Sequence, residues 1–182
     1  MKKIILMAAV GLIMSLTGNA QKQGFVNVGV LMHALPAYDK AEKDLNDYAK
    51  TFADALETMS KEYRTKVDAF KKEEKTMTEA MKEAKYQDIM SLEGRMSEYQ
   101  ESSQRKVADK QNTLMEPIIA NMNKAITEYA LSNNFDYIFS SEGLLFAKDS
   151  DNLTPALITK MGGKIKTADA ASAAQKGGTP GK

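Results

Sequence analysis

Few residues in this chain could do covalent or metal chemistry. Its 182 residues include one histidine, His33, and no cysteine. Without cysteine the chain can form neither a disulfide nor a thiolate nucleophile, and it cannot carry a lipid on an N-terminal cysteine. One histidine is too few for a histidine-rich metal site and leaves little room for a Ser-His-Asp triad. We therefore predict no metal site, no cofactor and no enzymatic activity.

Two short segments look like ligand-binding loops but depart from them at the deciding residues. Residues 149–152 match the start of a calcium loop, yet the sixth position is Thr154 rather than Gly and the twelfth is Lys160 rather than Glu. Residues 162–164 have the composition of a phosphate-binding loop, yet Ile158 stands where its first glycine belongs. Neither segment predicts a ligand site.

The methionines are stronger candidates for binding. Four of the 12 methionines lie near the middle of the chain, together with several lysines. Methionine is flexible and polarizable and suits varied apolar partners, and lysine adds a weak attraction to acidic partners that salt screens. The alternative is that these methionines fill space between helices. The candidate binding residues are Met77, Met81, Met90, Met96, Lys72, Lys75, Lys82 and Lys85.

The overall charge excludes some functions and favours helix. The chain has 25 Lys and Arg against 24 Asp and Glu, so it lacks the basic excess that is typical of nucleic-acid binders. Aromatic residues make up 7% and charged residues 27%. This composition is closer to a long solvated helix than to a compact enzyme.

The first twenty residues have the features of a secretory signal peptide. Lys2 and Lys3 precede an apolar run over residues 4–16, and small residues follow at Gly18 and Ala20. This pattern predicts export with cleavage after Ala20. A transmembrane anchor is the alternative, but the run is shorter than the roughly 20 residues of a spanning helix. We expect a mature protein without an integral membrane segment.

Residues 37–133 are predicted to form a long helical arm. Pro36 can begin a helix, and Pro117 and Gly94 are the two helix breakers within this stretch. Apolar residues recur every eleven positions, which indicates a nearly straight two-helix coiled coil. We predict an antiparallel hairpin with its tip within 76–91, one continuous rod being the alternative. The recurring residues are Tyr48, Met59, Phe70 and Met81, then Met96, Val107, Ile118 and Tyr129.

The apolar pattern weakens between residues 100 and 112. Ser103 and Lys110 occupy positions there that would face the partner helix. We expect loose packing in this part of the arm. Pro117 removes a backbone donor and is expected to kink the returning helix.

A small β-rich head is predicted from residues 21–36 and 134–161. It contains a strand at 24–32, a hairpin over 135–147 and a short helix at 154–161, and a disordered tail follows over 162–182. About forty residues are too few for an independent core, so the head should associate with other copies of the chain. The candidate association residues are Phe25, Val26, Val28, Val30, Tyr137, Ile138, Phe139, Leu145 and Phe146.

Five short segments resemble the Skp/OmpH family of periplasmic chaperones. They are residues 25–28, 34–38, 123–126, 135–138 and 151–158, and their order matches that family. The resemblance implies a mostly helical, jellyfish-like homotrimer, in which three long antiparallel helical arms hang from a small β-barrel head. It also implies an ATP-independent holdase that keeps unfolded outer-membrane β-barrel proteins from aggregating in the periplasm and delivers them for insertion.

One departure from the family lies in the charge of the arm. Well-known members are strongly basic there, whereas residues 37–133 carry 16 basic and 19 acidic residues. The sequence therefore does not favour binding to acidic lipid or lipopolysaccharide. Two other functions remain open: a structural coiled-coil spacer of the cell envelope, and an adaptor for one fixed partner.

Overall fold

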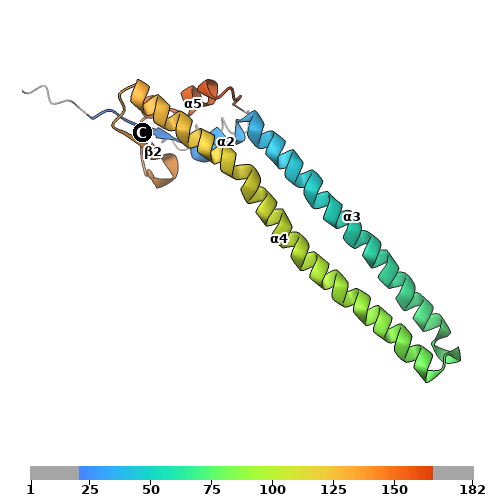
Figure 1. Cartoon of the computed structure of the whole chain (residues 1–182). Helices are drawn as coiled ribbons and strands as arrows, with labels where there is room; N and C mark the ends of the chain where they lie inside the picture. Colours follow the sequence, from blue (N-terminus) through green and yellow to red (C-terminus); the bar gives the residue numbers. More distant parts are fainter. Residues whose placement is uncertain (1–20, 166–182) are drawn as a thin grey trace, which may run out of the picture. The chain divides into compact units, whose positions relative to one another are not determined.

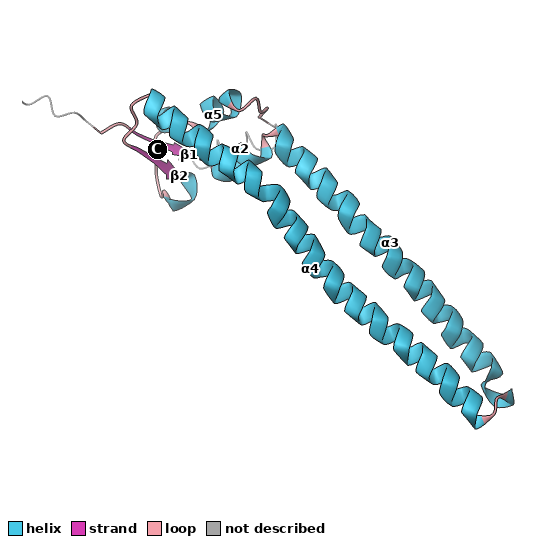
Figure 2. Ribbon diagram, in the orientation of Figure 1, coloured by secondary structure: helices cyan, strands magenta, loops and turns pink. Residues whose placement is uncertain are grey.

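The computed structural model describes residues 21–165, and the predicted signal peptide (1–20) and most of the predicted tail (166–182) lie outside them. These residues fall into two compact units. We call residues 21–34 and 123–165 the head unit, and residues 35–122 the arm unit. Figure 2 shows the elements: β1 (Gln23–Val26), α2 (Val28–His33), α3 (Pro36–Glu73), η1 (Glu74–Thr76), α4 (Glu79–Ser132), β2 (Tyr137–Ser140), η2 (Ser141–Gly143), η3 (Asp149–Asp151) and α5 (Thr154–Lys160).

The head unit is organised around a parallel pair of short strands. β1 and β2 pair with Gln23 opposite Tyr137 and Val26 opposite Ser140. One further hydrogen bond joins the two segments just before the paired residues. The Lys22 backbone N–H donates to a carboxylate oxygen of Asp136 at 2.7 Å. Parallel strands need a long crossover between them. Here the crossover consists of α2, α3, η1 and α4.

The predicted strand at 24–32 is wrong beyond Val26. The Asn27 side chain accepts a hydrogen bond from the Val30 N–H at 2.9 Å and caps the start of α2. Val30 and Leu31 then become buried in this six-residue helix. Burial on a helical face outweighs the modest strand preference of valine.

The predicted hairpin over 135–147 is also wrong, because β2 pairs with β1 rather than with a strand that follows it. The Ser140 hydroxyl accepts from the Glu142 N–H, and the chain enters the η2 turn. No strand follows this turn at residues 144–147. Pairing across more than 100 residues leaves no local turn signal in the sequence.

The head unit buries a small core of its own. Leu31 and Leu157 are fully buried, and Val26, Leu153 and Ile158 are nearly so. Backbone bonds bring these segments together: the Leu153 N–H donates to the Phe25 carbonyl at 2.8 Å. A single copy of the head thus already encloses several apolar side chains.

The tail does not begin at Gly162 as predicted. The Lys164 N–H donates to the Ala34 carbonyl at 2.9 Å. A Cβ atom on Gly163 would lie 2.7 Å from the same oxygen, so a glycine is needed for this close approach. The helix predicted at 154–161 is present as α5, which begins at Thr154 and ends at Lys160.

The arm unit consists of α3 and most of α4, which run side by side and antiparallel (Figure 1). α3 has 38 residues, and at 1.5 Å per residue it is about 57 Å long. The chain reverses through η1 and the two residues Met77 and Thr78, at the start of the predicted 76–91 window. Among residues 21–165, neither this pair nor any other helix is both long and apolar enough to cross a membrane.

The buried apolar residues of α4 within the arm unit lie toward its two ends. Ile89 and Leu92 are buried near the reversal, and Ile118 and Met122 are buried at the other end. Between them Ser103 is buried, and its hydroxyl donates to the Tyr99 carbonyl at 2.6 Å. We call this line of side chains between α3 and α4 the seam.

The first prediction concerns the bond that ties β1 to α5. The Thr154 hydroxyl, on a residue only 3% exposed, accepts from the Asn27 N–H at 2.9 Å. Replacing Thr154 by valine keeps the shape but leaves that N–H without its partner, which should destabilise the head by about 1–3 kcal/mol. Urea unfolding at fixed protein concentration measures this. Thr154→Ser, which keeps the hydroxyl, should stay close to the parent; equal losses in both variants would contradict the role of the bond.

Candidate functional site

Several large apolar side chains of the head unit are exposed. Tyr137 and Phe139 lie on one face of β2, and their rings stack with centroids 6.1 Å apart. Leu145 and Phe146 follow in an extended segment and are almost fully exposed. We call these four residues the head patch. Such a patch of aromatic and aliphatic side chains is typical of an association surface.

The free edge of β2 adds to this surface. β1 pairs with β2 on one side and bridges from Phe25 to Asn152 on the other. Within the described residues β2 has no second partner strand. An unpaired strand edge beside exposed aromatic rings is a ready site for pairing with another chain.

The other head residues predicted for association are less available. Val26 and Val30 belong to the core of the head unit. Phe25, Val28 and Ile138 are half-buried, and Val28 lies in α2 rather than in a strand.

The four candidate methionines do not form one surface. Met77 is buried at the reversal, so it does not offer the exposed apolar area that the sequence suggested. Met96 is half-buried, whereas Met81 and Met90 are about half exposed. Met81 and Met90 are nine residues apart, or two and a half helical turns, which places them on opposite faces of α4.

Tyr86 was missed in the sequence and completes one of these faces. It precedes Met90 by four residues, so the two side chains are neighbours, and they are 50% and 46% exposed. We call this pair the tip stripe. The sequence did contain a signal for this pair, because Tyr86 and Met90 are large apolar residues one helical turn apart and outside the seam.

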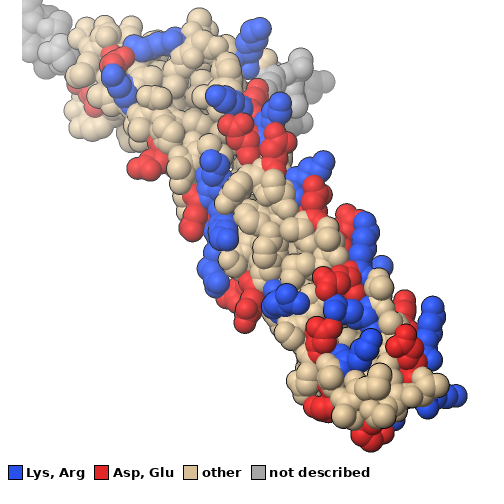
Figure 3. Space-filling view, turned by 45° about the vertical axis from the view of Figure 1, so that its right-hand side comes forward, with Lys and Arg blue, Asp and Glu red and all other residues tan. Residues whose placement is uncertain are grey.

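The four candidate lysines are partly paired with nearby carboxylates. Lys82 lies 2.8 Å from Glu79, whose hydrogen bond raises the lysine's pKa, and Lys85 lies 3.9 Å from Glu73. Lys72 and Lys75 are exposed. Figure 3 shows charges of both signs scattered over the arm. The lysines therefore do not make a separate basic patch.

Two ion pairs link α3 to α4 near the tip, and the one between Lys66 and Asp88 is the shorter. The Lys66 ammonium on α3 lies 2.6 Å from Asp88 on α4 and 3.6 Å from Glu62. The hydrogen bond from Lys66 lowers the pKa of the Asp88 carboxyl, and the same bond raises the pKa of Lys66. The pair is exposed and therefore salt-screened.

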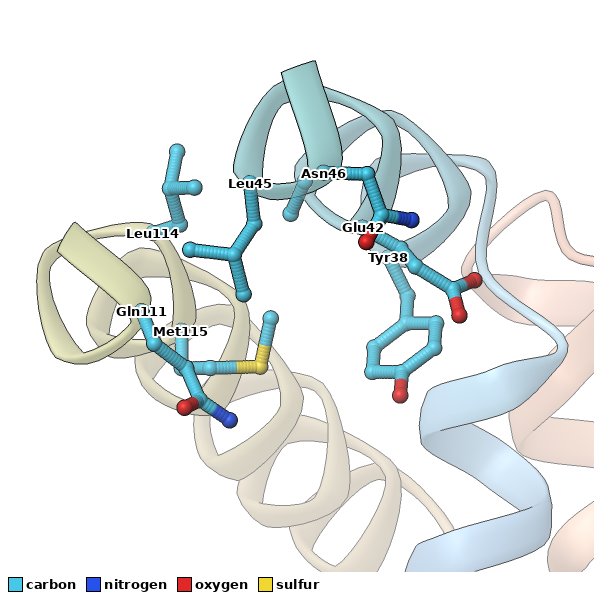
Figure 4. Close-up of a pocket in the computed structure, with 8 residues that line it drawn as sticks. Tyr38, Glu42, Leu45, Asn46, Gln111, Leu114 and Met115 are labelled. Atoms are coloured by element: carbon cyan, nitrogen blue, oxygen red, sulfur yellow. The ribbon is translucent and has the colours of Figure 1, made fainter. Parts of the chain in front are cut away.

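A pocket opens between α3 and α4 at the other end of the arm unit. Its volume is about 210 Å³. Figure 4 shows Leu45 of α3 and Met115 of α4 pointing into the space between the helices, with the Tyr38 ring beside them. We call it the root pocket; it is lined by Tyr38, Ala41, Glu42, Leu45, Asn46, Gln111, Leu114 and Met115.

A protein-family comparison decides the relationship. The model of the family described as outer membrane protein (OmpH-like) matches residues 22–161. The chain belongs to the OmpH-like family.

Several relatives are similar over nearly their whole length. Chaperone protein Skp of Photorhabdus luminescens is 22% identical over 167 residues, which cover 88% of this chain and 99% of that protein. Skp of Pectobacterium atrosepticum is 19% identical over 164 residues, with the same coverage of both chains. These relatives are named chaperones rather than enzymes.

A solved structure shows the same fold as this OmpH-like chain. The putative outer membrane chaperone (OmpH-like) from Caulobacter crescentus CB15 superposes with a TM-score of 0.71 at 9% identity. The match covers 79% of this chain and 85% of that one. Among residues 21–165 no group of three or more histidine, cysteine or carboxylate residues is placed to hold a metal ion.

The second prediction follows from the Lys66–Asp88 pair. Because the pKa of Asp88 is lowered in the fold, the pair stabilises the arm above the ordinary carboxyl pKa and is lost as pH falls through the lowered value. NMR titration of the Asp88 carboxyl measures this pKa. Lys66→Gln should return it toward the ordinary value and speed hydrogen exchange around residues 62–92.

Lys61→Gln is the matched control for that titration. Its Glu57 pair, at 2.6 Å, lies within α3 and does not link the helices. This variant should leave Asp88 and exchange in α4 unchanged. An Asp88 pKa that is insensitive to Lys66 would contradict the link.

Proposed function

We propose that this protein is an ATP-independent holdase that binds unfolded outer-membrane β-barrel proteins in the periplasm. It would prevent their aggregation and deliver them for insertion. The observation that carries the proposal is the long arm, on which exposed apolar side chains are dispersed among balanced charges. Full-length similarity to proteins named chaperone supports it. The leader predicted from residues 1–20, with cleavage expected after Ala20, supports the location.

Dispersed apolar contacts suit clients of varied sequence. Met81, Tyr86 and Met90 are each about half exposed. Covering the rest of such a side chain contributes about 1 kcal/mol, so several contacts are needed for useful affinity. Each contact is weak, so the contacts can break one at a time. Release then requires no ATP, which is absent from the periplasm.

The proposal includes a homotrimer that associates through its heads. The head patch and the free edge of β2 give the surface for this contact. The number three, and closure of the strands into a small barrel, come from the family resemblance. Three arms around a common space would multiply weak contacts with one client.

A structural spacer of the envelope is the second candidate. The feature that favours it is the i,i+4 and interhelical ion pairing along the arm, which any solvated coiled coil can have. A spacer needs no exposed Tyr86 or Met90. The two functions are separated by assay with unfolded clients.

The third prediction tests the head patch. Phe139 is 43% exposed in the single subunit, so Phe139→Asp should leave the subunit folded. In an association contact it would bury an unpaired carboxylate at a cost of several kcal/mol. Sedimentation should then show monomer. Ile119→Asp changes a residue of equal exposure on the arm and should remain a trimer; an intact Phe139→Asp trimer would exclude this face as the interface.

The fourth prediction tests the holdase activity and the apolar contacts that are proposed to hold the client. An unfolded outer-membrane barrel diluted from urea should scatter less light when the purified protein is present. Met81→Ser with Met90→Ser should weaken this protection, because apolar contact area is lost while the exposed positions tolerate serine. Raising salt from about 50 to about 500 mM should have a small effect, since the nearby charges are balanced.

Met77→Ser separates folding from binding in the same assay. Because Met77 is buried, its replacement should loosen the tip without removing exposed contact area. Undiminished aggregation of several clients at a molar excess of the parent would reject the holdase in favour of the spacer. If high salt abolished the protection while the double serine variant still protected the client, charge rather than apolar contact would account for client binding.

A further inference from the structure

The root pocket exists because two positions of the seam are underfilled. Ala41 is buried on α3 but has a small side chain. Gln111 on α4 lies four residues from Val107 and seven from Ile118, both on the seam, yet its side chain is exposed and polar. A larger apolar residue at position 41, or an apolar residue at position 111 that turned toward α3, would narrow the space between the helices. The chain instead leaves about 210 Å³ open.

The walls of the pocket differ in chemistry from its rim. Leu45, Leu114 and Met115 are half-buried and give an apolar interior, and Met115 lies beside the Tyr38 ring (Figure 4). The amides of Asn46 and Gln111 are exposed at the rim. An apolar interior accepts an apolar side chain, while amides offer both donors and acceptors to a peptide backbone. Glu42 is the single charged residue of the lining.

We propose that the root pocket receives one large apolar side chain, aromatic or leucine, from an extended segment of an unfolded barrel client. The inference rests on the proposed function and names how a client is held. The volume is below the 300–1,000 Å³ typical of small-molecule sites, which suits one side chain rather than a whole ligand. The rim amides of Asn46 and Gln111 bond the client backbone on either side of it.

The chemistry of barrel strands fits this arrangement. Such strands alternate apolar and polar residues and carry aromatic girdles, so an extended strand presents single apolar side chains between polar neighbours. Glu42 at the rim disfavours an acidic neighbour by charge. The chain's own C-terminal segment 166–182 has no aromatic, leucine, isoleucine, valine or methionine residue to fill the pocket.

The fifth prediction uses a double-mutant cycle between the protein and a client peptide. The probe is a synthetic peptide of about ten residues, the length of one barrel strand, with a single tryptophan. Binding is followed by tryptophan fluorescence. The protein has no tryptophan, so all of this fluorescence comes from the peptide. A second peptide carries serine at that position and is measured by competition. Gln111→Leu, made in the full-length protein, removes one rim amide and places an apolar side chain at the mouth of the pocket.

The expected result is about a tenfold weaker binding of the tryptophan peptide by Gln111→Leu. The serine peptide should bind the parent about as weakly, and combining both changes should cause no further loss. Gln111→Leu should also raise the thermal midpoint, because the added apolar group completes the seam. A pocket that is merely a packing defect would give the gain in stability without the loss in binding.

Asn112→Leu is the matched control, since it adds the same side chain at the neighbouring exposed position outside the lining. It should bind the tryptophan peptide as the parent does. Additive losses, equal losses in both leucine variants, or a changed oligomeric state of Gln111→Leu would overturn the pocket assignment. Absence of peptide binding by the parent would also overturn it. Light scattering with the whole barrel shows separately whether the holdase proposal stands.

Discussion

The parallel pairing of β1 with β2 is the constraint on which the rest of the structure depends. Strands that run in the same direction cannot be joined by a tight turn, so the chain between them must travel out and return. Here that crossover is a pair of long helices instead of one short helix. The bonds between residue 22 and Asp136 at the start of the ladder hold the first and last parts of the head together. The arm is thus an insertion within a β–α–β connection.

A two-helix arm has little to stabilise it apart from its seam. One helix face is covered and the remainder stays in water, which explains why the charged residues are numerous and of both signs. The well-buried residues lie toward the two ends, at Ile89 and Leu92 and at Ile118 and Met122. Between them Ser103 is buried, and its hydroxyl donates to the Tyr99 carbonyl of its own helix. The open root pocket follows from the residue types that line α3 and α4.

The parts of the fold that depend on periodicity could be predicted from the sequence. The eleven-residue repeat and the scarcity of breakers gave the two helices, and Thr154-Pro155 gave the start of α5. The parts that depend on pairing far along the chain could not. No local signal reveals that Tyr137 pairs with Gln23, and apolar valines at 28 and 30 gave a strand where Asn27 in fact caps a helix. This cap could have been predicted from the sequence, because asparagine is a preferred N-cap residue. The reversal was readable too, because the Thr78 hydroxyl accepts the Met81 N–H and caps α4 without any glycine or proline.

The candidate sites show the same division. Composition identified methionine-rich sequence near the tip, but solvent exposure is a property of the folded helix pair and separates buried Met77 from exposed Met90. Helical phase then pairs Met90 with Tyr86 and separates it from Met81. The root pocket could not be found from one helix alone, because it results from a small residue on α3 opposite a polar residue on α4.

The two kinds of exposed apolar surface differ in a way that bears on what each can bind. In the head, Tyr137, Phe139, Leu145 and Phe146 are exposed within a stretch of ten residues that includes a free strand edge, which can give a partner strand directional backbone bonds. Along the arm, the exposed apolar residues are single or in pairs and are surrounded by charge. Isolated contacts of this kind cannot specify one fixed partner, because each is weak and none supplies a continuous groove. Concentrated surface favours a lasting contact between identical chains, and dispersed surface favours brief contacts with many different ones. The first kind lies beside the paired strands and the second along the helices, so under the proposed function assembly and capture would use different residues.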